Sequence, residues 1–251
     1  MLTLFLLLAG PLALASTPPV SPATASAPTP AWKAQDANAA LAVAGACIEK
    51  KHFGSGPVGA PCAALFLASE QRVRGNSQRV RDGMMLAEIE LLQADGSWVK
   101  LEEVDGSFHH FVWVEPAQVY LGYASWYGEE GSYMLHLPGS KAAIRTRGVP
   151  VFSQDGKLLA GAKLDLYGNG GVELSVYAVQ GNKAAELFRT QYDPEVLLPV
   201  QPGQDSESPD AVSSLVFVDA DWLRMDMEVQ GKRHTVWVSV EDGALRLTAP
   251  T

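Results

Sequence analysis

The residues best suited to acid–base or metal chemistry in this sequence are histidines and carboxylates, and their spacing limits what they could do. His109 and His110 are adjacent. Adjacent side chains of a strand point to opposite faces, so this pair is poorly placed to hold one metal ion. Carboxylates are plentiful and include Glu102-Glu103 and Asp219 with Asp221. A glycosidase needs two acids at a set distance across a cleft, which the sequence does not specify. The catalytic residues are therefore unknown at this stage, and the pattern predicts no metal ion and no cofactor.

Motifs that identify an enzyme are missing from the chain. The sequence contains no G-x-S-x-G, no H-E-x-x-H, no P-loop and no C-x-x-C. The segment 54–59, GSGPVG, satisfies G-x-G-x-x-G, but dinucleotide binding requires a strand before this motif and a helix after it. Here the segment contains Pro57 and lies between two cysteines. We therefore predict no dinucleotide site, and the sequence favours a non-catalytic protein.

Cys47 and Cys62 are the two cysteines of the chain. In an oxidising compartment an even number of cysteines favours a disulfide. A bridge that closes a loop of this size would stabilise the fold by about 3 kcal/mol in the chain-entropy model. Two free thiols are the alternative. A redox or zinc role is not favoured, because the pair lacks C-x-x-C spacing and no second pair of ligands accompanies it.

A repeated arginine motif is the first candidate binding surface. The motif Q-R-V-R occurs at 71–74 and again at 78–81, and Gly75-Asn76-Ser77 joins the two copies. A hairpin would present four arginines as a basic ribbon: Arg72, Arg74, Arg79 and Arg81. Arginine makes bidentate contacts with carboxylates and phosphates, so the ribbon could dock on an acidic protein or an anionic envelope polymer. The alternative is a charged edge strand that resists aggregation.

An aromatic and acidic segment is the second candidate surface. Trp126 and Tyr127 precede Glu129 and Glu130 between two predicted strands. If exposed, these side chains could bind a sugar or a peptide. The alternative is a hairpin turn whose aromatic residues pack on the core.

The N-terminal residues predict export. Residues 2–14 are almost entirely apolar, and Ala13-Leu14-Ala15 is a small-x-small cleavage site, as in a secretory signal peptide at 1–15. No Lys or Arg precedes the apolar run, and a buried N-terminal helix is the alternative. Residues 16–31, rich in Pro, Ser, Thr and Ala, predict an extended linker. The expected location is the periplasm or the extracellular medium, and no later segment is long and apolar enough to span a membrane.

The composition describes a globular and acidic protein. The hydrophobic fraction is 47% and the formal net charge is −9. Nucleic-acid binding needs clustered positive charge to neutralise phosphates, so the sequence predicts no nucleic-acid partner.

Periodicity predicts a mainly β chain with a short N-terminal helix. The Ala-rich stretch 32–48 predicts the helix, and a Gly- and Pro-rich loop over 53–61 follows it. Farther along, apolar and polar residues alternate as in half-buried strands, most regularly over 222–229. Asp95-Gly96 and Asp105-Gly106 are turn signals. The predicted strands are 87–91, 99–101, 108–114, 119–127, 132–137, 158–166, 172–179, 222–229, 234–240 and 244–248.

These elements predict one β-rich domain over 32–251, built from antiparallel sheets. Within it, 32–83 form a helix and a Cys-bridged loop region that leads into the sheets. The Pro-, Ser- and Gln-rich stretch 198–210 is expected to be an exposed loop or insertion.

One part of the chain resembles a known repeat. The residues FSQDGKLLA at 152–160, followed by LSVY at 174–177, resemble the F-S-x-D-G-K-x-L-A…I-x-V-W pattern of WD40-like and TolB-like β-propeller blades. The stretches 118–137, 150–179 and 213–240 share one plan of strand, polar turn and strand. The resemblance implies a small or degenerate β-propeller-like fold, with a β-sandwich as the alternative. Propellers host many functions, so the resemblance indicates fold and not activity.

Export, a β-rich body and the arginine motif together favour a non-catalytic extracytoplasmic protein. Its expected partner is another protein or an anionic envelope component. One alternative is a secreted hydrolase acting on glycans or peptides, and another is a structural envelope accessory.

Overall fold

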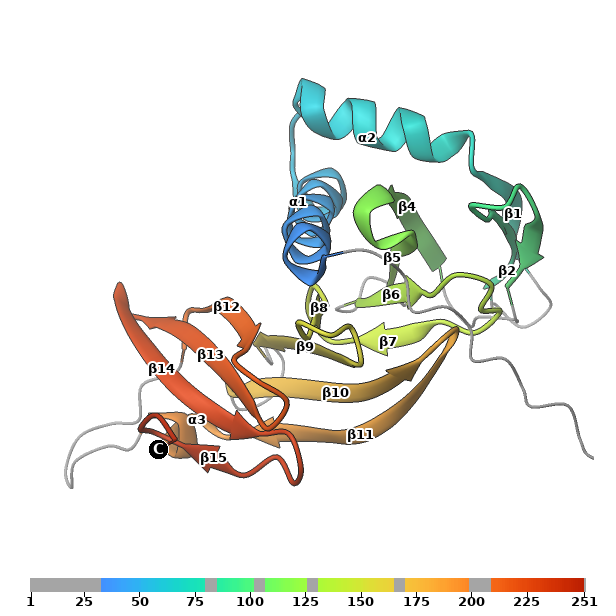
Figure 1. The fold of residues 1–251 in the computed structure, drawn as a ribbon. Coiled ribbons are helices and arrows are strands. Elements are labelled where there is room, and N and C mark those ends of the chain that lie inside the picture. Colours follow the sequence, from blue (N-terminus) through green and yellow to red (C-terminus); the bar gives the residue numbers. More distant parts are fainter. Residues whose placement is uncertain are drawn as a thin grey trace, which may run out of the picture.

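The computed structural model describes residues 33–79, 85–101, 107–125, 131–164, 170–198 and 209–250; for 76–79, 85–88, 107–109 and 125 it describes the backbone alone. The chain is mainly β, as predicted, with two helices at its N-terminal end and four antiparallel sheets after them (Figure 1). None of the helices among these residues is long and apolar enough to cross a membrane.

Each sheet is a meander in which strands that follow one another in the chain are neighbours. Sheet A contains β1 (Val73–Arg79), β2 (Met85–Leu92) and β3 (Trp98–Lys100). Sheet B contains β4 (Ser107–Val114), β5 (Val119–Ser125), β6 (Ser132–His136) and β7 (Ile144–Thr146). Sheet C contains β8 (Val151–Phe152), β9 (Leu158–Leu164), β10 (Val172–Gln180) and β11 (Lys183–Tyr192). Sheet D contains β12 (Ala211–Phe217), β13 (Trp222–Val229), β14 (Lys232–Ser239) and β15 (Leu245–Arg246).

The first helix, α1 (Ala34–Phe53), buries one face and extends farther than predicted. Ala37, Leu41, Ala44 and Ile48 recur at helical spacing and are buried. The helix continues past Ile48 because Glu49, Lys50 and Lys51 are good helix formers, and it ends at Gly54.

The predicted loop over 53–61 corresponds to residues 54–59, but the sequence did not predict a second helix after it. A second helix, α2 (Ala60–Glu70), begins with a proline at its first turn, a position where the missing N–H costs nothing. Two short helices, η1 (Glu115–Ala117) and α3 (Pro194–Leu197), complete the set.

Sheets B and C are packed against other elements on both faces. In sheet B, Val112 and Leu121 join the core that α1 covers, whereas Trp113 and Tyr120 pack on sheet A. In sheet C, Leu159 joins the core beneath α1. Leu174 and Val176 of the same sheet pack against sheet D, which contributes residues such as Leu223, Met225 and Val236. The sheets therefore follow one another in the order A, B, C, D, with α1 beside B and C.

Three of the four sheets match the predicted blade-like units. Each of sheets B, C and D is a four-stranded meander of about 40 residues, the length of a propeller blade. A tight turn at 153–157 joins β8 to β9: Asp155 accepts hydrogen bonds from the Ser153 hydroxyl and the Lys157 amide, and Gly156 takes a φ of 71°. The described residues do not show closure into a propeller ring.

Candidate functional site

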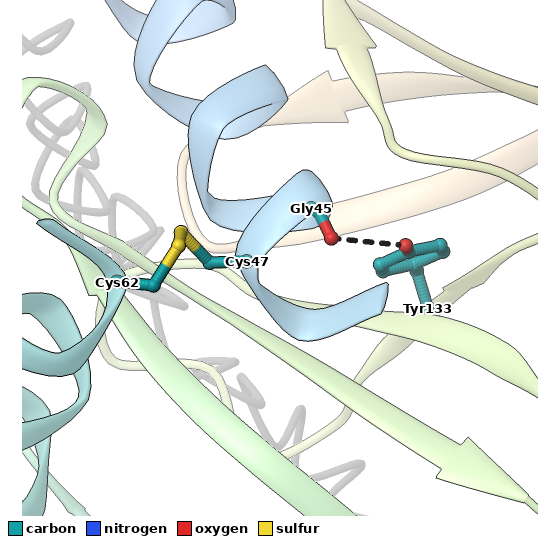
Figure 2. Close-up of a disulfide and its surroundings, with 4 residues drawn as sticks. All are labelled: Gly45, Cys47, Cys62 and Tyr133. Atoms are coloured by element: carbon teal, nitrogen blue, oxygen red, sulfur yellow. Dashed lines mark hydrogen bonds between the residues drawn. A yellow bond between two sulfur atoms is a disulfide. The ribbon is translucent and has the colours of Figure 1, made fainter. Parts of the chain in front are cut away.

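Cys47 of α1 and Cys62 of α2 form a disulfide, as the sequence predicted. Their Cα atoms are 5.3 Å apart. Figure 2 shows the disulfide on one side of α1 and Tyr133 of β6 on the other. The bridge therefore fixes α2 to the helix that also forms one wall of the site described below.

Arg72, the first arginine of the predicted ribbon, is tied to its own chain. Its guanidinium lies 4.1 Å from the ring centre of Trp113, its Nη2 donates to the Leu92 carbonyl at 3.2 Å, and its Nε donates to the Tyr120 hydroxyl at 3.3 Å. These contacts link the start of sheet A to sheet B and fix the position of the guanidinium.

The structure describes the other three arginines to different extents. Arg74 is exposed, stacks on Trp98 at 4.0 Å and forms an ion pair with Glu90 at 2.7 Å. For Arg79 the structure describes the backbone, which pairs with Met85, and Arg81 lies outside the described residues. Gly75-Asn76-Ser77 lies inside β1 and is not the hairpin turn that we expected. The arginine ribbon therefore stays a prediction.

Trp126 and Tyr127 lie outside the described residues. The residues on either side of that segment border a cleft, because Tyr123 and Gly131 line it. The Gly131 amide donates to the Tyr123 hydroxyl at 2.9 Å.

This open cleft, of about 670 Å³, is the candidate functional site. One wall is α1, which contributes Asn38, Ala42, Ala46, Glu49 and Phe53. The opposite wall comes from three segments: residues 147–151, residues 162–164 of β9, and residues 210–215, which are Asp210 and the first five residues of β12. Residues from distant parts of the sequence therefore meet in one place.

Main chain forms much of the second wall. Each of its three segments lines the cleft with consecutive residues. In the two strand segments, 162–164 of β9 and 211–215 of β12, neighbouring side chains point to opposite sides, so a consecutive run of lining residues places the backbone edge at the cleft. The wall accordingly presents peptide groups as well as side chains.

Close backbone contacts position the α1 wall. Gly45 packs against Val149 so tightly that a Cβ on this glycine would lie 2.3 Å from a methyl carbon of Val149. The Asn38 side chain makes two hydrogen bonds of 2.8 Å with the backbone of Phe152, one as donor and one as acceptor. Gly45 is thus the point where α1 meets the segment 147–151.

The floor of the cleft holds a tyrosine that stays protonated. The Tyr133 hydroxyl donates to Glu49 Oε1 at 2.9 Å and lies 3.4 Å from the Gly45 carbonyl oxygen. Burial and then the neighbouring Glu49 carboxylate raise the pKa of Tyr133 well above its ordinary value. This hydroxyl acts as a fixed hydrogen-bond donor that orients Glu49.

Two other charged groups of the cleft, Arg147 and Asp210, also have partners within the chain. Arg147 forms an ion pair with Glu173 of β10, with 3.0 Å between Nε and Oε2. Asp210 accepts a hydrogen bond of 2.6 Å from the Gln230 amide. These contacts brace the walls.

Aromatic rings line one end of the cleft. Phe53 is 65% exposed, and its ring centre lies 5.7 Å from that of Tyr123, which in turn lies 5.4 Å from that of Tyr133. His52 stacks on Tyr123 at 4.8 Å. An exposed phenylalanine at the mouth gives a ligand an apolar surface to cover.

The histidines and the glycine motif noted in the sequence lie elsewhere. His110 packs near Phe66, and the side chain of His109 is not described. The segment 54–59 connects two helices and so lacks the strand that dinucleotide binding requires. Within the described residues, no three His, Cys, Asp or Glu side chains group closely enough to hold a metal ion.

No protein-family model matches this chain, and no curated protein matches it.

The sequence did not single out the residues of the cleft. Glu49, Tyr133 and Asp210 are far apart in the chain and belong to no common motif. The available signal was Gly45 inside an Ala-rich helix, since a glycine there costs stability and points to a close approach of another segment.

Proposed function

We propose that this chain is an exported, non-catalytic binding module that holds part of another protein in the cleft between α1 and β12. The observation that carries the proposal is the composition of the cleft: backbone edges on one wall, and an exposed aromatic side chain at one end. Peptide groups and exposed aromatic rings are the surfaces that recognise polypeptides.

Two observations support export. The first is the apolar run at residues 2–14 with its small-x-small site. The second is the Cys47–Cys62 disulfide, a bond that persists in oxidising compartments. The periplasm is the location that we favour.

The state of the polar groups supports binding over turnover. A general base or nucleophile needs a group free to exchange a proton with the substrate. In the cleft, Tyr133 is held protonated against Glu49, and Arg147 is engaged by Glu173. These groups are braced as a fixed surface would require.

Filling the cleft tests the proposal. Ala46→Trp would place a large side chain in the cleft from an exposed position of α1. Val43→Trp is the matched control, because Val43 is also exposed on α1 but does not line the cleft. Each variant and the parent chain would be purified with the disulfide formed, immobilised and exposed to envelope extract, and retained proteins would be identified by mass spectrometry.

We expect a stoichiometric partner on the parent and on Val43→Trp and its loss on Ala46→Trp. A partner that all three baits retain would move the binding surface away from the cleft. If no bait retains a partner, and the parent hydrolyses a glycan or peptide substrate that Ala46→Trp does not, the cleft would be an active site and the proposal would fail.

A further inference from the structure

We infer that the cleft binds its partner by strand addition: an extended segment of the partner protein pairs with the free edge of β12 and extends sheet D. This inference rests on the proposed function and specifies how the cleft recognises its ligand.

β12 is an edge strand that opens on the cleft. Among the described strands it pairs with β13 alone, and sheet D begins with it. The segment 210–215 lines the cleft with consecutive residues. An edge strand carries a row of main-chain donors and acceptors that can pair with another chain.

The hydrogen-bond pattern identifies the groups that face outward. The Val218 amide donates to the Trp222 carbonyl of β13 at 2.9 Å. Backbone groups of an antiparallel strand alternate in direction, so Val216 and Ser214 also face β13, while the N–H and C=O groups of Phe217 and Leu215 face away from it. Leu215 lies within the cleft, and Phe217 follows just beyond it.

A bulge limits how much of the edge can pair. The register of β12 against β13 shifts between Val212 and Ser214, which leaves Ser213 as an extra residue, and its hydroxyl donates to the Asp226 carbonyl at 3.2 Å. Bulges interrupt edge pairing. The added strand is therefore short and lies along the part of β12 after Ser213.

The side chains around the edge indicate the sequence of the ligand. Val212, Leu215 and Phe217 pack on the core between sheets C and D but stay partly exposed. On the other face of the strand, Val216 is 42% exposed. A strand added here would place every second side chain on the apolar inner face, so its apolar residues alternate with residues that tolerate solvent.

The ligand comes from another protein and not from the lead of this chain. The segment 16–31 precedes α1, whose residue Asn38 lines the cleft, and it contains five prolines. Proline has no N–H to donate to a ladder. The net charge of −9 also favours a basic partner segment through long-range attraction.

Hydrogen exchange of individual amides tests the inference. The ¹⁵N-labelled chain with its disulfide would be titrated to millimolar concentration with a peptide of alternating Val and Thr flanked by lysines. A second peptide of the same sequence, with every second backbone nitrogen methylated on one edge, keeps the side chains but cannot form the ladder. We expect the unmodified peptide to slow exchange of the Leu215 and Phe217 amides by about tenfold or more, with Ser214 and Val216 unchanged, because β13 already protects them. The methylated peptide should have no effect.

Other outcomes overturn the inference in distinguishable ways. Equal effects of both peptides, or no protection at millimolar concentration, exclude strand addition; if Ala46→Trp still loses its partner in the pull-down, the proposed function stands. Protection of Leu215 and Phe217 without peptide, rising with protein concentration, would show that a second copy of this chain occupies the edge. Shifts at Phe53 and Tyr123 with a soluble glycan, and none with either peptide, would make the ligand a carbohydrate.

Discussion

Two sheet edges border the cleft, β8 and β12, and only one of them is covered by other parts of the chain. The edge of sheet C at β8 is covered, because the Asn38 side chain gives Phe152 both a donor and an acceptor, and residues 147–148 lie against the next part of β9. The edge of sheet D at β12 borders the open cleft instead. A covered edge serves stability, whereas an edge left open inside a cleft is available to a ligand. This difference is the reason why we propose recognition at β12 and a structural role for Asn38.

Removing the hydrogen bonds by which Asn38 covers the edge of β8 should have the largest effect on stability. Asn38→Leu keeps the approximate shape of the side chain but removes its two hydrogen bonds with the Phe152 backbone. Losing a hydrogen bond to a buried group is costly, so we expect the two losses together to lower the free energy of unfolding by about 2–4 kcal/mol. Urea denaturation would measure it.

Asn182→Leu is the control for this prediction. The Asn182 amide is exposed, and its contact with the Gly139 carbonyl is 3.5 Å long. Its loss should change stability by about 0.5 kcal/mol or less. Equal effects of the two substitutions would mean that Asn38 does not cap the edge.

How far the sequence predicts this architecture depends on how local each signal is. The alternation of Leu223, Met225, Met227 and Val229 placed β13 correctly, because a strand with one buried face has a period of two. The strand β11 carries no such alternation, since most of its residues are exposed, and the sequence did not reveal it. α2 was missed for a related reason: it is apolar nearly throughout, so no periodicity distinguishes it.

The cleft is hardest to predict because it depends on contacts between distant residues. Asn38 and Phe152 are 114 residues apart, and neither belongs to a motif. Residue types and spacing along the chain suggested Trp126, Tyr127 and the arginines, but which groups already have partners depends on the fold. Arg72 illustrates this point, as Trp113 and the Leu92 carbonyl engage it.

His136 is a buried side chain without a hydrogen-bond partner, and its effect on stability should depend on pH. This side chain is 1% exposed, its two ring nitrogens lack hydrogen-bond partners, and burial lowers its pKa to about 4. The unfolded chain takes up the proton near pH 6.5, so stability should be complete above that pH and should fall as the pH drops from 6.5 to 4, by about 3 kcal/mol.

The comparison with His136→Leu isolates this effect from carboxylate titration. Denaturation of both proteins across this pH range gives a difference curve. The variant should lack this pH-dependent loss, so its stability relative to the parent should rise by about 3 kcal/mol as the pH falls from 6.5 to 4 and stay constant above pH 6.5. A constant difference would show that His136 does not titrate on unfolding.

Adding a methyl group where Gly148 packs against β9 should have a moderate effect on stability. A Cβ on Gly148 would lie 1.9 Å from the Ala162 carbonyl oxygen, which is backbone and cannot swing aside. We expect Gly148→Ala to destabilise the fold by about 1–3 kcal/mol, as overpacking does. Gly56→Ala is the control, because nothing lies within 4 Å of a Cβ there. Thermal unfolding of the two variants would compare them, and a similar melting temperature would argue against a tight cover over this edge.

A lysine on the open edge strand β12 should leave the stability of the fold nearly unchanged. Val216 is 42% exposed, and its side chain lies on the outer face of sheet D beside Arg224. Val216→Lys should change the free energy of unfolding by about 0.5 kcal/mol or less, since surface substitutions away from special features have small effects. Lysine on an edge strand also opposes pairing with another strand. The same variant should therefore weaken retention of a partner in the pull-down while its urea midpoint stays that of the parent. A large loss of stability would mean that β12 is a structural edge like β8, and the contrast between the two edges would disappear.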